Sequence, residues 1–382
     1  MLIERRRFFR QLATGVAAGA ALPVLGETAW GRGWPARLGG RAYVPGGPVR
    51  LDSNENAYGP SAKALDAIQG NLDTANRYPK GEYEALVAAI AARHNVKPEQ
   101  VVLGCGSSEN LRMAAAAYLG PDKLLLYANP TFESIAHHAQ EEGAQVAAIP
   151  LTREYAHDLD AMLARATGAS GLVYICNPNN PTATLTPRAD LELFLRKLPP
   201  TFKVLLDEAY HHFVVDNPAY TSFLDKPVDD DRLIVTRTFS KIYGLAGIRI
   251  GYAIAAPQTA KQLGAQRMGF AITVLTARAA LAAWNDPDAV RTGAARNAND
   301  RQEFYRQARA RGLAFIPSET NFLMLQSGRP APDVIDHFKK NNVLIGRPFP
   351  PMTDYVRISL ATPPEMQEFW RVWDLLPENK AA

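Results

Sequence analysis

The sequence predicts an α/β protein with a mainly parallel central sheet, followed by a smaller α+β domain at the carboxyl end. Two observations support this prediction. Short apolar runs alternate with helical patterns between residues 101 and 255, which favours a parallel sheet covered on both faces. After a long polar helix expected over Asp286–Arg311, strand patterns are followed by a helix instead of alternating with helices, which is typical of an α+β layer.

The expected strands are short and rich in aliphatic residues. In the central sheet they are Val101–Leu103, Leu124–Leu126, Gly171–Cys176, Val204–Leu206, Leu233–Val235 and Ile250–Ala255. In the smaller domain they are Asn321–Leu325, Val343–Ile345 and Tyr355–Ser359, with a last helix from about Pro364 to Leu375. We therefore divide the chain into residues 1–31, an extended arm over 32–60, a large domain over 61–285 and a small domain over 286–382.

Composition narrows the class of protein. With 382 residues, 47% of them hydrophobic, the chain can bury a large core. The net charge of +4 is mild, and no dense basic patch follows the amino terminus, so we expect no nucleic-acid partner. The two cysteines, Cys105 and Cys176, lie beside apolar strands and are expected to be core residues. The histidines lack the spacing of helical metal ligands, so we expect no metal.

Residues 1–31 have the pattern of a signal peptide. The basic run Arg5–Arg10 precedes Leu12–Leu25, an uncharged stretch too short to be a membrane span. Arg5 and Arg6, with Phe8-Phe9 following, resemble a twin-arginine export signal. We therefore expect an exported, periplasmic protein without a stable membrane span in the mature chain. The alternatives are an uncleaved anchor and a fortuitous basic terminus on a cytoplasmic protein.

Three polar segments follow apolar strands, and each carries reactive side chains. Lys241 follows the strand Leu233–Val235 and is flanked by small hydroxyl residues, a setting that suits an amine held in a site. Such a lysine can form a Schiff base with a carbonyl cofactor, of which pyridoxal phosphate (PLP) is the common one. Asp207 ends one strand and Asn180 follows another. The carboxyl ends of parallel strands are where ligands bind in open α/β sheets, so these residues should meet.

The ordered motifs Asn177–Thr182, Asp207–Tyr210 and Thr238–Arg249 resemble those of the fold-type I PLP-dependent aminotransferases of class I/II. The resemblance is greatest to the histidinol-phosphate aminotransferase branch and runs from about Leu51 to about Leu375. It implies transfer of an amino group between an amino acid, or an amino-acid-like phosphate ester, and a 2-oxo acid. A carbon–sulfur lyase or an amino-acid decarboxylase on the same scaffold remains an alternative, and a non-catalytic PLP-binding protein is a third reading.

The resemblance implies a role for each residue around the cofactor ring. Lys241 would form the Schiff base and, once freed, move the Cα proton. Asp207 would pair with the pyridine nitrogen and keep it protonated. Asn180 and Tyr210 match the positions that hydrogen-bond the 3′-oxygen, and Phe132 matches the aromatic residue that stacks on the ring.

The cofactor phosphate would be held by backbone amides, hydroxyls and a guanidinium. The turn at the start of an expected helix supplies free amides that attract an anion. The matching residues are Gly106, Ser107, Ser108, Thr238, Ser240 and Arg249. Tyr78 matches a tyrosine that reaches the same phosphate from a partner subunit, which implies a homodimer with shared active sites.

The resemblance also implies substrate contacts. Arg357 would grip the substrate carboxylate, because a planar guanidinium binds a carboxylate through two hydrogen bonds. Arg347 matches a position linked to the distal group of the substrate. Asn56 and Tyr58 belong to the motif Asn54–Pro60, whose residues are expected to line the substrate pocket. Histidinol phosphate is a cytosolic intermediate, so the expected export argues against it as the substrate.

Overall fold

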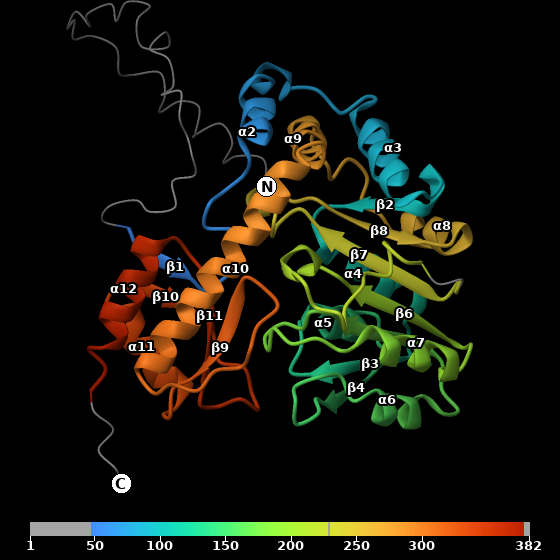
Figure 1. Ribbon diagram of the computed structural model, residues 1–382. Helices are drawn as coiled ribbons and strands as arrows, with labels where there is room; N and C mark the ends of the chain where they lie inside the picture. The colour runs from blue at the N-terminus through green and yellow to red at the C-terminus, as the bar shows by residue number, and fades with distance from the viewer. Residues whose placement is uncertain (1–46, 228–229, 378–382) are drawn as a thin grey trace, which may run out of the picture. The chain divides into compact units, whose positions relative to one another are not determined.

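A seven-stranded sheet forms the core of the larger part of the protein (Figure 1), as described by a computed structural model covering residues 47–227 and 230–377. The strand order is β2-β8-β7-β6-β5-β3-β4, and only β8 runs antiparallel to its neighbours. The strands are β2 (Val101–Gly104), β3 (Leu124–Asn129), β4 (Gln145–Pro150), β5 (Gly171–Cys176), β6 (Phe202–Asp207), β7 (Leu233–Thr238) and β8 (Gly251–Ala255). The predicted α/β class and mainly parallel sheet are confirmed.

Helices cover both faces of this sheet because successive strand residues point to opposite sides. On β6, for example, Leu205 packs with one helical layer while Val204 and Leu206 pack with the other. The first layer consists of α4 (Ser107–Tyr118), α5 (Ser134–Glu141) and α8 (Pro257–Ala265). The second contains α2 (Ala62–Gln69), α3 (Glu82–His94), α6 (Leu159–Ala166), α7 (Arg188–Lys197) and α9 (Val274–Trp284). We call the sheet with both layers the large lobe.

A second hydrophobic core lies at the other end of α10 (Pro287–Ala310), the long helix expected from the sequence. We call this part the small lobe. Its elements are β1 (Val49–Leu51), β9 (Phe322–Gln326), β10 (Val343–Ile345), β11 (Tyr355–Ser359), α11 (Ala331–Lys340) and α12 (Pro363–Trp373). Strand β1 pairs in parallel with β10, and β11 pairs antiparallel with β9. The chain thus enters the small lobe before it builds the large one.

Helix boundaries follow from local chemistry. The Ser61 side chain accepts a hydrogen bond from the Ala64 amide at the start of α2, and Asp158 does the same for Ala161 in α6. These side chains satisfy amides that a helix leaves without partners. At α12, Thr362 and Glu365 form a reciprocal capping box.

Two strands were absent from the sequence prediction. Strand β4 is at the edge of the sheet and only partly buried, and its short apolar run, Val146–Ile149, contains two alanines, which are depleted in strands. Strand β1 has three residues and is defined by its partner β10, almost 300 residues away. The predicted signal peptide and most of the arm lie outside the described residues. Within residues 47–227 and 230–377, no helix is long and apolar enough to span a membrane.

Candidate active site

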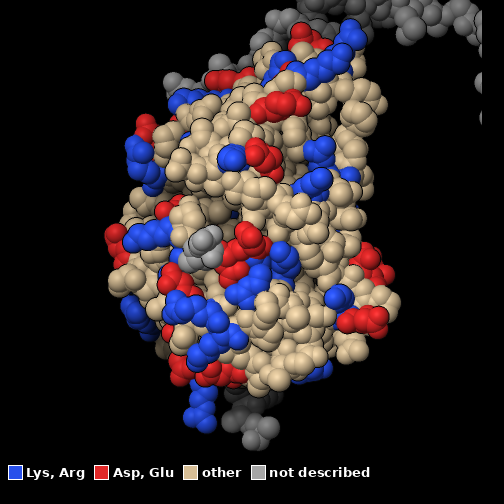
Figure 2. Space-filling view, turned by 90° about the vertical axis from the view of Figure 1, so that its right-hand side faces the viewer, with Lys and Arg blue, Asp and Glu red and all other residues tan. Residues whose placement is uncertain are grey.

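A cavity of about 710 Å³ opens where the carboxyl ends of the central strands face the small lobe. Twelve of the residues expected from the sequence line it: Ser107, Ser108, Phe132, Asn180, Asp207, Tyr210, Thr238, Ser240, Lys241, Arg249, Arg347 and Arg357. Parallel strands end at the same edge of a sheet, so residues far apart in sequence converge there. Figure 2 views the large lobe from the other end of the sheet, away from this cavity, and charges of both signs are interspersed over that face.

Lys241 lies in the turn after β7, with its amine inside the cavity. Its Nζ donates hydrogen bonds to the backbone oxygens of Asn54, at 3.1 Å, and Ser53, at 3.4 Å. Burial first, and the Arg357 charge second, lower the pKa of Lys241 to about 8, although Glu55 and Asp207 oppose this shift. A usable fraction of neutral, nucleophilic amine therefore exists near neutral pH.

Asp207 is the last residue of β6 and is buried at the cavity wall. Burial raises the pKa of Asp207 to about 6, although hydrogen bonds from the Tyr174 hydroxyl and the Ala209 amide, both at 3.0 Å, favour the ionised form. Tyr174 was not expected from the sequence. The sequence signal for its role was a tyrosine within the otherwise aliphatic strand β5, because a buried tyrosine hydroxyl needs a hydrogen-bond partner.

One end of the cavity is built to receive an anion. Helix α4 begins after Gly106, and Ser107 and Ser108 form its first turn with amides that no helical carbonyl can reach. A Cβ atom on Gly106 would lie only 2.1 Å from Arg249 Nη2, so the guanidinium packs directly against the turn. Arg249 Nη1 also donates to Ser240 Oγ at 3.4 Å.

Gly106 itself does not line the cavity. It has a φ of +78°, which L side chains rarely adopt. The residue therefore permits both the turn and the close approach of Arg249.

A second cationic group lies at the small-lobe wall. Arg357 on β11 donates from Nη1 to Asn180 Oδ1 at 2.7 Å and from Nη2 to the Asp52 backbone oxygen at 2.5 Å. Its Nε is buried without a hydrogen-bond partner. Burial lowers the pKa of Arg357 to about 10. A desolvated guanidinium with an unused donor is suited to an anionic ligand.

The start of the motif Asn54–Pro60 lies at the cavity, together with the two residues before it. Asp52, Ser53, Asn54 and Glu55 all line it. Asn54 Nδ2 donates to the Tyr210 hydroxyl at 3.1 Å, and the Asn54 amide donates to Ser359 Oγ at 2.8 Å. Burial raises the pKa of Tyr210 well above its ordinary value. Asn54 therefore links the two lobes beside Lys241.

Asn56 and Tyr58, which were expected to line the substrate pocket, lie apart from Lys241 within this chain, so their contact with substrate stays a prediction. Neither borders the cavity around Lys241; both border a separate cavity of about 380 Å³ beside α10. Asn56 Nδ2 donates to the Ile242 backbone oxygen at 2.9 Å, and the Tyr58 hydroxyl donates to Asp300 at 2.9 Å. In this chain the two side chains brace the turn after Lys241 and helix α10 instead.

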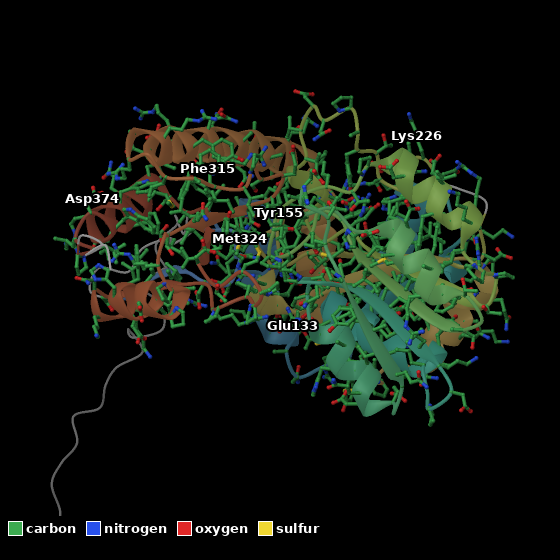
Figure 3. The ribbon with its side chains drawn as sticks, turned by 90° about the horizontal axis from the view of Figure 1, so that it is seen from below. Glu133, Tyr155, Lys226, Phe315, Met324 and Asp374 are labelled. Atoms are coloured by element: carbon green, nitrogen blue, oxygen red, sulfur yellow. The ribbon has the colours of Figure 1, made fainter. Side chains whose placement is uncertain are left out.

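Arg347 lies at the cavity rim and forms an ion pair with Glu133 across the two lobes, with Nη2 to Oε2 at 2.6 Å. Figure 3 shows Glu133 and Tyr155 near the boundary between the lobes. Both partners of the ion pair are about half exposed, so an arriving ligand can compete for the guanidinium.

Tyr78 does not border the cavity of its own chain. Its side chain is 71% exposed and packs against Phe270, which is 78% exposed, with ring centroids 4.8 Å apart. Its expected contribution to a partner's site therefore stays a prediction.

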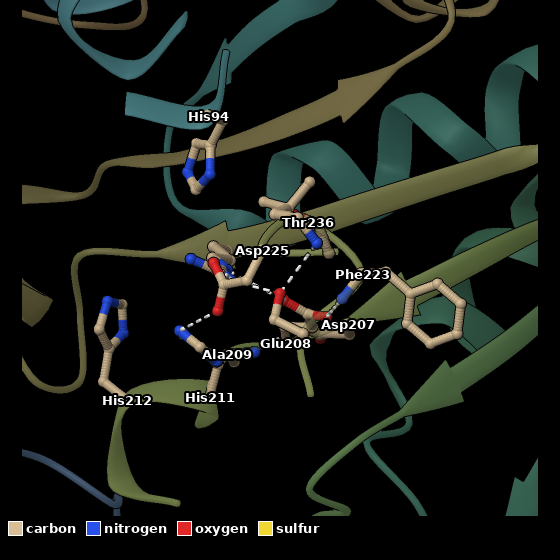
Figure 4. A network of polar contacts seen from close by, with 12 residues as sticks. His94, Asp207, Glu208, Ala209, His211, His212, Phe223, Asp225 and Thr236 are labelled. Atoms are coloured by element: carbon tan, nitrogen blue, oxygen red, sulfur yellow. Dashed lines mark hydrogen bonds and ion pairs between the residues drawn. The ribbon is translucent and has the colours of Figure 1, made fainter. Parts of the chain in front are cut away.

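Beneath the cavity, a buried polar network joins the ends of β6 and β7 (Figure 4). Arg237 Nε donates to Glu208 Oε2 at 3.0 Å, and both side chains are almost fully buried. The other Glu208 oxygen accepts from the Phe223 amide at 2.9 Å. Arg237 lies between Thr236 and Thr238, so its side chain points to the opposite face of the sheet. The Arg237–Glu208 ion pair thus holds the ends of β6 and β7 together on the face of the sheet opposite the cavity.

The donor set suits a phosphorylated pyridine aldehyde. The α4 turn and Arg249 suit a phosphate, Lys241 suits a carbonyl, and Asp207 suits a ring nitrogen. The positions of Phe132 and of the unpartnered Arg357 Nε leave room for a flat ring and an anionic substrate. No group of three or more His, Cys, Asp or Glu residues that could hold a metal ion occurs in the described ranges. Fold and site together define a PLP-dependent enzyme of fold type I.

The comparisons with known proteins agree with this class. Residues 47–372 match the family "Aminotransferase class I and II". The chain is 36% identical over 318 residues to a histidinol-phosphate aminotransferase from Moorella thermoacetica, covering 80% of this chain and 82% of that protein. The chain therefore belongs to the class I and II aminotransferases.

Solved structures add the cofactor. Histidinol-phosphate aminotransferase from Sinorhizobium meliloti, solved with pyridoxal 5′-phosphate, has a TM-score of 0.79 and 29% identity, covering 86% of this chain and 89% of that one. L-threonine-O-3-phosphate decarboxylase from Porphyromonas gingivalis has a TM-score of 0.73 and 22% identity, covering 85% and 97%, and shares the fold alone. The protein is a PLP-dependent aminotransferase.

Proposed function

We propose that this enzyme moves an amino group between an anionic amino donor and a 2-oxo acid, and that the donor is an amino acid or an amino-acid-like phosphate ester such as histidinol phosphate. The observation that supports this proposal best is Arg357, a buried guanidinium with an unpartnered Nε at the wall of the cavity that holds Lys241. The names of the curated relatives also favour the phosphate ester.

Each side chain has a distinct task in this proposal. PLP supplies an electron-withdrawing ring that stabilises negative charge at the substrate Cα. Lys241 removes and returns the Cα proton, for which its lowered pKa of about 8 is suited. Asp207, in its ionised form, pairs with the ring nitrogen, and Asn180 and Tyr210 bind the ring oxygen. Phe132 packs on the ring face and excludes water from it.

The phosphate end and the substrate end are separate. The amides of Ser107 and Ser108, the hydroxyls of Thr238 and Ser240, and the Arg249 guanidinium bind the cofactor phosphate. Arg357 binds the carboxylate of an amino acid or the phosphate of an ester. Arg347 exchanges Glu133 for the distal group of the longer substrates, because that ion pair lies at the open rim.

We propose a homodimer in which Tyr78 reaches the cofactor phosphate of the partner subunit. The large lobe exposes a group of apolar side chains that supports such an interface. They are Leu72, Tyr78, Met268 and Phe270. Large apolar side chains exposed together mark an interaction surface more often than a solvated one.

We also propose that residues 1–31 direct export by a twin-arginine-type route, with a periplasmic enzyme as the result. The basic run and the apolar stretch that follows it support this proposal. Export of an already folded chain would allow the cofactor to be acquired beforehand. If the enzyme is cytoplasmic instead, histidinol phosphate becomes the leading substrate.

A donor screen tests the proposal. Purified enzyme is assayed with 2-oxoglutarate and a panel of donors that includes histidinol phosphate, its dephosphorylated form histidinol, and neutral and acidic amino acids. We expect turnover with anionic donors and little with histidinol. Efficient turnover of histidinol would contradict the role of Arg357, and release of carbon dioxide or sulfide without amino transfer would contradict transamination.

A further inference from the structure

Glu109 lies in the first turn of α4 and is 8% exposed, which is unusual for a carboxylate without a strong cationic partner. Its only cationic neighbour among the described ion pairs is Arg112, whose Nη2 is 3.8 Å from Glu109 Oε1. Glu109 does not border the cavity around Lys241. Its burial therefore needs an explanation other than direct contact with a ligand.

The two oxygens of Glu109 accept hydrogen bonds from two different parts of the chain. Oε2 accepts from the Cys105 amide at 2.5 Å, in the turn that precedes Ser107 and Ser108. Oε1 accepts from the Met268 amide at 2.9 Å, in the loop between α8 and α9. The carboxylate thus joins the turn at the anion-binding end of the cavity to a loop at the surface.

The loop is the one that presents exposed apolar side chains. Met268 is 62% exposed, and Phe270 packs against Tyr78. A second tie comes from α4, since Arg112 Nη2 donates to the Gln266 backbone oxygen at 2.6 Å. Arg112 hydrogen-bonds the loop and meets the turn only through its 3.8 Å ion pair with Glu109, so the two ties can be weakened separately by mutation.

We propose that Glu109 is a positioning residue that fixes the phosphate-binding turn and the exposed loop together, so that affinity for the cofactor phosphate and self-association both depend on it. This inference rests on the phosphate site and the homodimer proposed above. Each partly buried amide that loses its acceptor carries a desolvation cost, and a single carboxylate satisfies both. A glutamine cannot replace it, because its NH₂ group cannot accept a hydrogen bond.

Electrostatics and positioning predict opposite outcomes for Glu109→Gln. Removing a negative charge near a bound phosphate should by itself tighten phosphate binding. Releasing the Cys105 amide should weaken phosphate binding, and releasing the Met268 amide should loosen the loop. A fall in phosphate affinity after loss of an anion would therefore identify positioning as the role.

The experiment compares two probes on cofactor-free enzyme. Wild type and Glu109→Gln are titrated with pyridoxal phosphate and with pyridoxal, which lacks the phosphate. We expect about 5- to 100-fold weaker binding of pyridoxal phosphate and pyridoxal affinity within about twofold. We also expect faster hydrogen–deuterium exchange over residues 266–273 and a higher dimer dissociation constant by sedimentation.

Two further variants complete the design. Glu99→Gln removes an exposed carboxylate elsewhere and should match the wild type in every measurement. Arg112→Gln should loosen the loop and weaken self-association but leave the preference for pyridoxal phosphate intact. Unchanged or tighter phosphate binding by Glu109→Gln, or an unchanged loop, would overturn the proposal.

Measurements on the wild type alone test the proposed phosphate site and the proposed homodimer, on which this inference rests. A wild type that binds pyridoxal as tightly as pyridoxal phosphate would refute the proposed phosphate site, and a monomeric wild type would refute the proposed homodimer. Either result would also remove the inference about Glu109. The two levels of failure are therefore distinguishable.

Discussion

Tyr174 donates its hydroxyl hydrogen to Asp207 Oδ2 at 3.0 Å, and both side chains are buried behind the cavity. The two residues come from the neighbouring strands β5 and β6 and lie on the same face of the sheet. Burial raises the pKa of Asp207, and this hydrogen bond lowers it. The pair therefore sets the charge of the carboxylate that we assign to the ring nitrogen.

Replacing Tyr174 with Phe should lower kcat/KM by roughly 10- to 150-fold, the value of one hydrogen bond to a charged group. The pKa of Asp207, already raised to about 6, should rise further, so more of the carboxyl is protonated at any given pH. The loss should therefore be largest at low pH and shrink as pH rises. A pH profile of kcat/KM parallel to that of the wild type would contradict this role.

Lys241 should be the residue that captures the cofactor. Borohydride reduction of the yellow enzyme should leave a pyridoxyl group on Lys241, located by peptide mapping, and Lys241→Ala should abolish turnover without unfolding the protein. An adduct on another lysine would refute the assignment.

The rate of cofactor capture should depend on pH through the Lys241 amine. Its pKa is lowered to about 8, and only the neutral amine is nucleophilic. The capture rate should therefore rise about tenfold per pH unit below pH 8 and level off above it. Stopped-flow absorbance measures this rate; a rise that continues toward the ordinary lysine pKa near 10.5 would show that the amine is not desolvated.

Gly106→Ala should weaken cofactor binding roughly 10- to 150-fold, because the new Cβ displaces the Arg249 guanidinium from the turn. Gly168→Ala is the matched control. Gly168 has a similar φ, +73° against +78°, but a Cβ there meets nothing within 4 Å. Both variants should lose stability to backbone strain, and Gly106→Ala should lose more, because Gly106 combines its positive φ with a ψ of 162°, a conformation that essentially only glycine adopts. Equal cofactor affinities in the two variants would exclude the steric explanation.

Arg357→Ala should cost about 2–5 kcal/mol of transition-state stabilisation with every donor, or roughly 30- to several-thousand-fold in kcat/KM. Arg347→Ala should affect only donors with an anionic or polar distal end, since Arg347 lies at the rim. Steady-state kinetics with glutamate and with a phosphate-ester donor distinguish the effect of Arg357→Ala from that of Arg347→Ala. Normal glutamate turnover by Arg357→Ala would show that the site assignment is wrong.

Glu208→Gln should lower the free energy of unfolding by about 3–5 kcal/mol, because it leaves the buried Arg237 without its main partner. The double variant Glu208→Leu with Arg237→Met should recover much of that loss. Glu303→Gln, which removes an exposed ion pair with Arg306, is the control and should change stability little. Urea denaturation measures the free energy of unfolding of all three variants. If Glu208→Gln were as stable as the wild type, the Glu208–Arg237 pair would not hold the strand ends.

Part of this site was predictable because its chemistry is encoded locally. Lys241, Asp207 and Asn180 each follow an apolar run, and strand ends in a parallel sheet converge whatever lies between them. Tyr174 was not predicted, because it acts through Asp207 on another strand, 33 residues away. The motif that contains Asn54 was expected at the pocket, but its hydrogen bond to Tyr210, across 156 residues, could not be predicted from sequence. A motif fixes neighbours in sequence and not the direction of each side chain, so it could not show that Asn54 and Glu55 border the cavity around Lys241 while Asn56 and Tyr58 border another.

The sequence by itself determined the alternation of strands and helices, the order of the polar segments, and therefore the fold class and the cofactor chemistry. Only the tertiary structure decided that β1 joins β10, that Arg357 reaches Asn180 across the lobes, and that Glu109 serves both a turn and a loop. Periodicity and strand-end chemistry are local properties. Pairings between distant segments depend instead on which buried donors and acceptors satisfy one another once the core has packed.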